Sequence, residues 1–371
     1  MIRALKINKI INHEETPMKI GYMMMLANHH DNLSDAEMIR EEMRVAEMAE
    51  EAGYDSLWCA EHHFDSYSMA VDNIQILTWL AARTKNIMIG SAAIILPWWT
   101  QPVRLVEKIA TIDAMTNGRY LIGFGRGLAR KEYDAFGIPM DETRARFDES
   151  AKMIIKALDT GYIEGDGPHF PQVRTEIKPK PPQNTKDRVY GVAMSPESAQ
   201  VMGELGAKMM CFVQFDMAMH LPNIERYRSA FTAEHQRPAP PPVLLDFCYC
   251  DKDIGKAKDR ARKYLAVNYL SILQHYEFME DYHKEIKGYE AYGKSAEFLN
   301  SLGLEEAVED YISHQAWGTP QQILDQLEAR RSILGDFEWN SIISYGGMPF
   351  DLVEGSMRLI GKEVLPELRK W

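Results

Sequence analysis

Residues 86–125 read NIMIGSAAIILPWWTQPVRLVEKIATIDAMTNGRYLIGFG. The apolar run at 86–96 predicts a long buried strand. Pro102 suits the first position of a helix, and Gly118 ends the apolar periodicity that follows it. The run RYLIGFG at 119–125 then predicts a second strand. A strand, a helix and a further strand in this order form a βαβ unit, whose two strands run parallel.

The same alternation continues on both sides of this unit. Further strands are expected at 18–26, 54–60, 189–193, 208–213, 243–250 and 340–345. Helices are expected from the capping box at Ser34 to Gly53, at 72–84, 141–160, 195–206, 222–236 and 319–335, after strand seven, and at the end of the chain. Residues 161–188 and 276–318 read as long irregular insertions after strands four and seven.

Eight strand–helix units predict one α/β domain, a (β/α)8 TIM barrel over residues 18–371. Residues 1–17 are expected to be an N-terminal extension, since the first strand starts at Met18. The alternative is a pair of doubly wound domains divided near residue 165. Neither half carries a dinucleotide-binding fingerprint, which favours the barrel.

Composition narrows the class of protein. The chain has 371 residues, 46% of them hydrophobic, and a formal net charge of −12. An acidic surface repels phosphate backbones, so nucleic acid is not an expected partner. No apolar run approaches the roughly 20 residues that cross a bilayer, and the first residues lack a signal-peptide core. The four cysteines have no CxxC spacing, which favours a reducing, cytoplasmic setting.

Polar residues at the carboxyl ends of the strands are the candidates for chemistry, because functional groups of such barrels lie there. Glu61-His62-His63 follows the second strand. Adjacent residues of a strand point in opposite directions, so the two histidines are not expected to share a metal ion. One histidine would bond into the rim of the barrel, and the other could transfer protons at its mouth. Strand alternation alone does not say which.

Two further strand ends carry candidates for anion binding. Arg126 lies between Gly125 and Gly127, where an arginine can reach a phosphate while the backbone approaches closely. Ser195 and Ser198 open a helix and offer hydroxyls beside free backbone N–H groups, although plain capping would also explain them. Other candidates are Arg144 and Arg146, which could equally be surface cations, and a pocket lined by Trp98, Trp99, Met25 and Met194.

Together these residues resemble the bacterial luciferase family, and the luciferase alpha subunit most closely. The similarity covers nearly the whole chain from Met18. It rests on five motifs in family order, at residues 61–64, 89–97 with 101–104, 117–120, 123–128 and 136–144. The resemblance implies a flavin-dependent monooxygenase that binds reduced FMN at the C-terminal face of the barrel.

The resemblance also implies roles for individual residues. His62 corresponds to the active-site histidine. The cofactor would lie against Ala92, Ala93, Ala193 and Met194, and its phosphate against Arg126, Arg144, Ser195 and Ser198. Ala92-Ala93 matches a non-proline cis peptide beside the isoalloxazine. The substrate pocket would contain Trp98, Trp99 and Met25.

The implied reaction uses reduced FMN and O2 to oxygenate a small organic substrate through a flavin peroxide. A separate flavin reductase would supply the cofactor, and the chain would form a homo-oligomer. Three departures from the alpha subunit argue against light emission: Gly125 replaces a reactive cysteine, Met194 a glutamate, and Trp98-Trp99 smaller residues. Two alternatives remain. One is a deazaflavin-dependent hydride-transfer enzyme, which the arginine pair fits less well; the other is a non-catalytic flavin-binding subunit, which the retained His62 disfavours.

Overall fold

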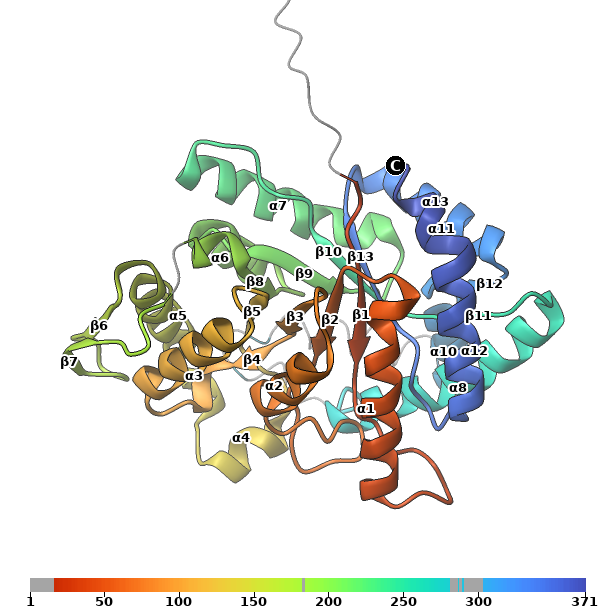
Figure 1. The fold of residues 1–371 in the computed structure, drawn as a ribbon, viewed down its shortest axis with the longest axis horizontal. Helices are drawn as coiled ribbons and strands as arrows, with labels where there is room; N and C mark the ends of the chain where they lie inside the picture. The colour runs from red at the N-terminus through yellow and green to blue at the C-terminus, as the bar shows by residue number, and fades with distance from the viewer. Residues whose placement is uncertain (1–16, 182–183, 281–285, 287–288, 290–302) are drawn as a thin grey trace, which may run out of the picture.

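The computed structural model describes residues 17–181, 184–280, 286, 289 and 303–371. Its central feature is a closed barrel of parallel strands surrounded by helices (Figure 1). The barrel strands are β1 (Ile20–Met24), β2 (Ser56–Cys59), β3 (Met88–Ser91), β4 (Ile94–Ile95), β5 (Tyr120–Gly125), β8 (Val189–Val192), β9 (Lys208–Phe212), β10 (Val243–Phe247) and β13 (Glu338–Ile342).

The strand order confirms the predicted (β/α)8 barrel. It runs β3-β2-β1-β13-β10-β9-β8-β5-β4, and β3 also pairs with β5, which closes the ring. The predicted strand at 86–96 is divided into β3 and β4, and both halves pair with β5. The described strands therefore fill eight positions around the barrel, all of them in parallel register.

Helices cover the outside of the barrel (Figure 1). They are α1 (Asp35–Ala52), α2 (Asn73–Arg83), α3 (Pro102–Met115), α4 (Arg130–Phe136), α5 (Thr143–Thr160), α6 (Pro196–Leu205), α7 (Met217–His235), α8 (Ile254–His275), α10 (Leu304–His314), α11 (Pro320–Leu334), α12 (Phe350–Leu359) and α13 (Leu365–Leu368). The predicted capping box of α1 is present, with Ser34 and Glu37 bonded to each other's backbone N–H. Within the described ranges, no helix has both the length and the apolar character of a membrane span.

Gly123 allows strands β5 and β3 to pack closely at the carboxyl end of the barrel. A Cβ on Gly123 of β5 would lie 1.9 Å from the carbonyl oxygen of Ser91 on β3. Backbone cannot yield by that distance, so only glycine fits this position. The Ser91 hydroxyl accepts the Gly123 N–H at 3.1 Å across the same junction. The strand end that precedes Arg126 is therefore fixed by direct backbone packing.

The insertions are more regular than the sequence predicted. Residues 161–188 contain an antiparallel hairpin of β6 (Tyr162–Gly165) and β7 (Gln172–Glu176), followed by a short 3-10 helix η3 (Thr185–Arg188). The prediction of a loop there was wrong because both strands are short and only Ile163 among their residues is buried, so they lack an apolar alternation. In the second insertion, residues 281–285, 287–288 and 290–302 lie outside the described residues.

Three boundaries also differ from the predictions. Helix α10 lies within the segment 276–318 that was expected to be irregular; its stripe of Ala307, Tyr311 and Ile312 is buried. Helix α7 begins at Met217, where Asp216 caps it, rather than at residue 222. The predicted strand 243–250 is interrupted at Cys248, and β11 (Tyr249–Cys250) pairs instead with β12 (Trp317–Gly318).

A buried carboxyl on α1 gives the fold a testable pH dependence. Glu42 is 1% exposed and bonds to the Ser344 hydroxyl. Burial raises the pKa of Glu42 to about 7, although the Ser344 hydrogen bond opposes the shift. The folded state therefore holds this proton more tightly than the unfolded chain does. The resulting stability is complete below the ordinary carboxyl pKa and is lost as pH rises through about 7.

We expect Glu42→Gln to remove this loss. At pH 8 the variant should be more stable than the parent by roughly 3 kcal/mol, because about 1.4 kcal/mol accompanies each pKa unit. Urea unfolding at pH 5 and pH 8 measures the difference. A parent protein whose stability does not fall over this range, or a variant that falls equally, would contradict the assignment to Glu42.

Candidate active site

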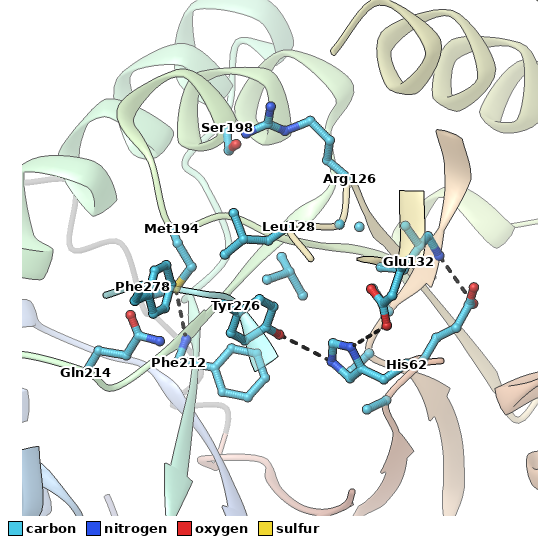
Figure 2. Close-up of a pocket in the computed structure, with 18 residues that line it drawn as sticks. His62, Arg126, Leu128, Glu132, Met194, Ser198, Phe212, Gln214, Tyr276 and Phe278 are labelled. Carbon is cyan, nitrogen blue, oxygen red and sulfur yellow. Dashed lines mark hydrogen bonds and ion pairs between the residues drawn. The ribbon is translucent and has the colours of Figure 1, made fainter. Parts of the chain in front are cut away.

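A cleft opens at the carboxyl ends of the barrel strands (Figure 2). Its volume is about 850 Å³, including the open mouth. Its lining combines apolar side chains with a few ionisable ones. The residues are Ala60, Glu61, His62, Ala92, Ala93, Ile95, Gly125, Arg126, Gly127, Leu128, Glu132, Val192, Met194, Ser198, Phe212, Gln214, Tyr276 and Phe278. An apolar pocket with few convergent polar groups is typical of cofactor and substrate sites.

His62 lies on one wall of this cleft and is held at both ring nitrogens. Its Nδ1 lies 3.2 Å from Oε1 of Glu132, and its Nε2 lies 3.4 Å from the hydroxyl of Tyr276. Because an ionised carboxylate only accepts, Glu132 favours the tautomer with the proton on Nδ1. Nε2 then carries the lone pair, which faces the Tyr276 hydroxyl and the cleft and can take up a proton there (Figure 2).

Glu132 comes from α4, a helix that the sequence did not predict. Its carboxylate is 1% exposed and also accepts the backbone N–H of His63 at 2.7 Å. Burial pushes the pKa of Glu132 upward, but His62, His275 and the His63 N–H outweigh burial and leave that pKa lowered. Glu132 is therefore a carboxylate near neutral pH, and it stabilises positive charge on His62.

His63, which like His62 follows the end of β2, does not line the cleft. Its Nε2 lies 3.5 Å from Oε1 of Glu61. Its ring packs edge-on against Phe136 at 4.8 Å and Trp98 at 5.5 Å. The structure thus answers the question that the sequence left open: His62 faces the cleft, and His63 packs into the rim.

Two of the predicted anion-binding residues, Arg126 and Ser198, line the opposite end of the cleft, whereas Arg144 and Ser195 are absent from its lining and bond to Ser198 from behind it. Arg126 points toward Ser198 (Figure 2), and its guanidinium stacks over the ring of Tyr289 at 3.9 Å. Arg144 donates to the Ser198 hydroxyl at 3.0 Å. Ser195 caps α6 by accepting the Ser198 N–H at 3.3 Å. Two arginines and two hydroxyls at a helix N-terminus form a donor set suited to a phosphate.

The expected cis peptide is present between Ala92 and Ala93. Both residues line the cleft. The side-chain amide of Asn73 donates to the Ala93 carbonyl at 3.1 Å and ties the junction of β3 and β4 to helix α2.

Some predicted residues are not brought to the cleft. Met25, Trp98 and Trp99 are absent from its lining. Trp98 turns back to donate to Glu61 at 2.8 Å, and Trp99 lies against the ammonium of Lys108 at 5.1 Å. These contacts occupy both tryptophans in the rim. Ala193, which precedes Met194, is buried and is not part of the lining either.

Sequence reasoning missed several lining residues, above all Glu132, Leu128, Phe212, Gln214, Tyr276 and Phe278. Glu132 lies on α4, which the sequence did not predict, so its approach to His62 depends on tertiary folding. Tyr276 and Phe278 follow α8, in a segment whose path the sequence pattern does not define. Their role depends on tertiary folding, which places the end of α8 across the barrel mouth.

A third ionisable cluster bears on metal binding. Among the described residues, His62, Glu132 and His275 offer ligand atoms that all lie within 4.8 Å of one another. Glu132 and His62 already share a hydrogen bond, so neither of these two ligand atoms requires a metal ion as a partner. The expectation that no metal binds here remains a prediction.

The barrel thus brings two arginines, Arg126 in the lining and Arg144 bonded to Ser198 behind it, and a histidine–carboxylate pair to one apolar cleft at the carboxyl ends of its strands. The family model described as luciferase-like monooxygenase matches residues 18–336. The chain therefore belongs to the luciferase-like monooxygenase family, and the resemblance seen in its sequence is confirmed.

Relatives support this assignment over nearly the full length. The alkanal monooxygenase alpha chain of Photorhabdus luminescens is 26% identical, over 95% of this chain and 98% of that protein. Two solved structures share the fold. One is the oxygenating constituent of 3,6-diketocamphane monooxygenase from Pseudomonas putida, a type II Baeyer–Villiger enzyme in complex with FMN (TM-score 0.74, 16% identity, 95% and 98% coverage). The other is an F420-dependent secondary alcohol dehydrogenase (TM-score 0.70, 16% identity, 95% and 99% coverage).

Proposed function

We propose that this protein is a monooxygenase that uses reduced FMN and O2 to oxygenate a small organic substrate. One observation carries the proposal: a single cleft has a phosphate-type donor set at one end and a histidine held by a buried carboxylate at the other. Reduced FMN would supply the electrons that activate O2. The residues of the chain would bind the cofactor, exclude water and handle protons.

The donor set fits the FMN phosphate. Arg126 and Arg144 would neutralise its charge, while the Ser198 hydroxyl and the backbone N–H groups at the N-terminus of α6 would donate hydrogen bonds to its oxygens. Ala92 and Ala93 line the cleft with small side chains, which leave room for an aromatic ring system. Leu128 and Phe212 add apolar wall that keeps water from the reacting centre.

His62 would hold or move a proton at Nε2. The buried Glu132 carboxylate fixes Nδ1 and stabilises the imidazolium that forms when Nε2 takes a proton. The apolar lining favours an uncharged organic substrate. Aldehydes and ketones are the first compounds to try, since relatives are named for an alkanal and for a Baeyer–Villiger reaction.

The alternative cofactor is a deazaflavin, which a structural relative binds. The discriminating experiment titrates the purified protein anaerobically with reduced FMN and with reduced F420, and then admits air. We expect tight binding of reduced FMN and its rapid oxidation on the protein. Preference for F420, with a complex that is stable in air, would overturn the proposal in favour of hydride transfer.

We further propose that a separate reductase supplies reduced FMN, in a cytoplasmic setting. The described residues form one barrel with its insertions, and they contain no second nucleotide-binding fold that could reduce the flavin. All four cysteines are buried thiols, as expected in a reducing compartment.

A homo-oligomer is expected from the helices beside the early strands. Trp79 on α2 is 47% exposed, and Met115 at the end of α3 is 67% exposed. Exposed large apolar side chains on neighbouring helices favour association. Light scattering at micromolar concentration should give a dimer or a larger species, and Trp79→Glu should shift it toward the monomer. A monomeric parent protein would contradict the expectation.

A further inference from the structure

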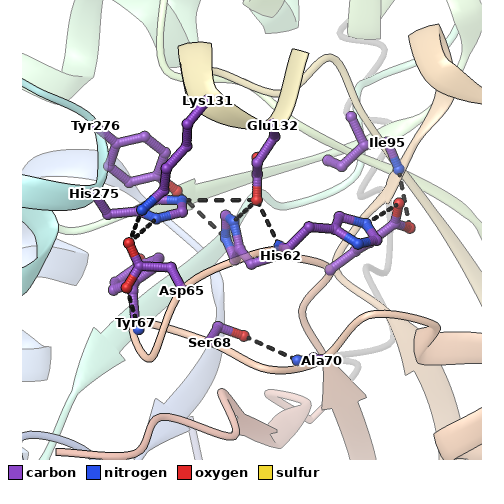
Figure 3. A network of polar contacts seen from close by, with 12 residues as sticks. His62, Asp65, Tyr67, Ser68, Ala70, Ile95, Lys131, Glu132, His275 and Tyr276 are labelled. Atoms are coloured by element: carbon purple, nitrogen blue, oxygen red, sulfur yellow. Dashed lines mark hydrogen bonds and ion pairs between the residues drawn. The ribbon is translucent and has the colours of Figure 1, made fainter. Parts of the chain in front are cut away.

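A second histidine lies behind His62 and has no part in the function proposed above. His275, the last residue of α8, is 1% exposed. Its ring meets that of His62 edge-on at 4.9 Å and stacks on Tyr67 at 4.5 Å (Figure 3). A histidine buried this deeply costs free energy unless both of its nitrogens are used.

The two nitrogens of His275 face two different carboxylates. Nδ1 lies 3.3 Å from Oδ2 of Asp65, and Nε2 lies 3.8 Å from Oε1 of Glu132. Asp65 accepts from Nδ1, which leaves the lone pair on Nε2. Within the described part of the chain, Nε2 has no hydrogen-bond partner. A buried lone pair thus points at the carboxylate that holds His62.

The outer end of this chain of groups reaches solvent. The Asp65 side chain is 23% exposed and forms an ion pair with Lys131, which is 34% exposed. Figure 3 shows Asp65, His275, Glu132 and His62 in continuous succession from that ion pair to the cleft. The successive N···O separations are 3.3, 3.8 and 3.2 Å.

We propose that Glu132, His275 and Asp65 form a proton path that connects His62 with solvent behind the flavin cleft, and that His275 is its central positioning residue. The inference rests on the proposed function, in which His62 gains and loses a proton in each turnover. A path that avoids the cleft lets His62 reset while the cofactor and substrate keep water out.

Each step of the path conserves charge and atoms. The imidazolium of His62 releases its Nδ1 proton to Oε1 of Glu132, and Glu132 passes a proton to Nε2 of His275. His275 simultaneously gives its Nδ1 proton to Oδ2 of Asp65, from which water removes it. These transfers leave the remaining proton of each ring on Nε2. When His62 later gives up its Nε2 proton in the cleft, the same steps run in reverse from water and restore the Nδ1 protons of His275 and His62. One N–H or O–H bond breaks and one forms at each transfer, and no electrons are exchanged. Glu132 must shift by roughly half an ångström to bring the 3.8 Å step within hydrogen-bond reach.

The surroundings of His275 disfavour a protonated, positively charged ring and so favour this coupled transfer. Burial first, and then the charge of His62, lower the pKa of His275 to about 2; Lys131 acts in the same sense, while Glu132 and Glu277 oppose it. The ring therefore stays neutral and can only take a proton at one nitrogen as it gives one from the other. A neutral histidine is also the form that binds a metal ion, so the experiments below distinguish a proton path from a metal site.

The first test uses the cofactor-free protein and is independent of any reaction. Imidazole NMR measures how fast the Nδ1 proton of His62 exchanges with water. We expect His275→Gln, which keeps hydrogen bonding but cannot relay a proton, to slow this exchange at least about tenfold. Asp65→Asn should slow it as well, and it keeps the test decisive if His275→Gln does not fold. Unchanged exchange in folded variants would overturn the proposal, whatever the enzyme's reaction.

The second test uses turnover with reduced FMN. His275→Ala should slow it about tenfold or more. Added imidazole should restore the rate, whereas pyrazole, which is of the same size but weakly basic, should not. Rescue by both compounds would indicate a merely structural role. Stoichiometric zinc in the purified parent protein, lost in His275→Gln, would also overturn the proton path in favour of a metal site.

Discussion

His62→Ala is expected to leave the affinity for reduced FMN within about twofold of the parent while product formation slows by ~10²-fold or more. The reason is geometric. His62 faces the cleft at the end away from Arg126 and Ser198, so its removal does not touch the proposed phosphate contacts. Its loss removes the group whose Nε2 handles the proton, while Glu132 keeps its hydrogen bond from the His63 backbone N–H. Stopped-flow oxidation of the reduced-flavin complex, with product analysis, measures both quantities.

His63→Ala is the matched control, since the neighbouring histidine points into the rim. It should lower the free energy of unfolding by about 1–3 kcal/mol through lost contacts with Phe136 and Trp98, and should leave turnover of the folded enzyme near that of the parent. If His62→Ala turned over normally while His63→Ala did not, the two roles would have to be exchanged. Normal turnover of both would refute the histidine mechanism.

Arg126→Ala is expected to weaken binding of reduced FMN by roughly 1.5–3 kcal/mol, the range for hydrogen bonds to charged groups. Arg126 lies at the end of β5 in the cleft and points toward Ser198, where Arg144 also donates. Loss of its guanidinium removes a charge and its hydrogen bonds from the phosphate position. Fluorescence titration under anaerobic conditions gives the dissociation constant.

The matched control for this prediction lies on α5. Arg146 is two residues from Arg144, but it pairs with Glu142 at 2.9 Å and lies over Phe170 at 5.9 Å, away from Ser198. Arg146→Ala should therefore leave FMN affinity unchanged, whereas Arg144→Ala should weaken it. Equal affinities for the parent and Arg126→Ala would refute the phosphate assignment.

The barrel was predictable because its strands are buried on both faces. Runs such as 86–96 and 119–125 are almost continuously apolar, and prolines and glycines mark where helices start and end. The hairpin of β6 and β7 and helix α10 were missed for the opposite reason. The strands of the hairpin are short and lack an apolar alternation, and the apolar stripe of α10 is short, with only Ala307, Tyr311 and Ile312 buried.

In the candidate site, too, the residues next to barrel strands were predictable and those on the helices were not. Arg126, Ser195 and His62 adjoin barrel strands, whose ends meet at one face, so their convergence follows from the fold. Glu132 and His275 come from α4 and from the end of α8, which approach each other only in the tertiary structure. No spacing in the sequence relates positions 132 and 275, and the network around His62 was therefore visible only in three dimensions.

The most direct test of the proposed monooxygenase activity follows the oxygen atoms. The protein is loaded with chemically reduced FMN, mixed with ¹⁸O2 and a panel of aldehydes and ketones, and the products are analysed by mass spectrometry. We predict a product that carries a single ¹⁸O atom, with the yield lost in His62→Ala. Oxidation of the flavin with hydrogen peroxide as the sole labelled product throughout the panel, or substrate oxidation without ¹⁸O, would contradict it.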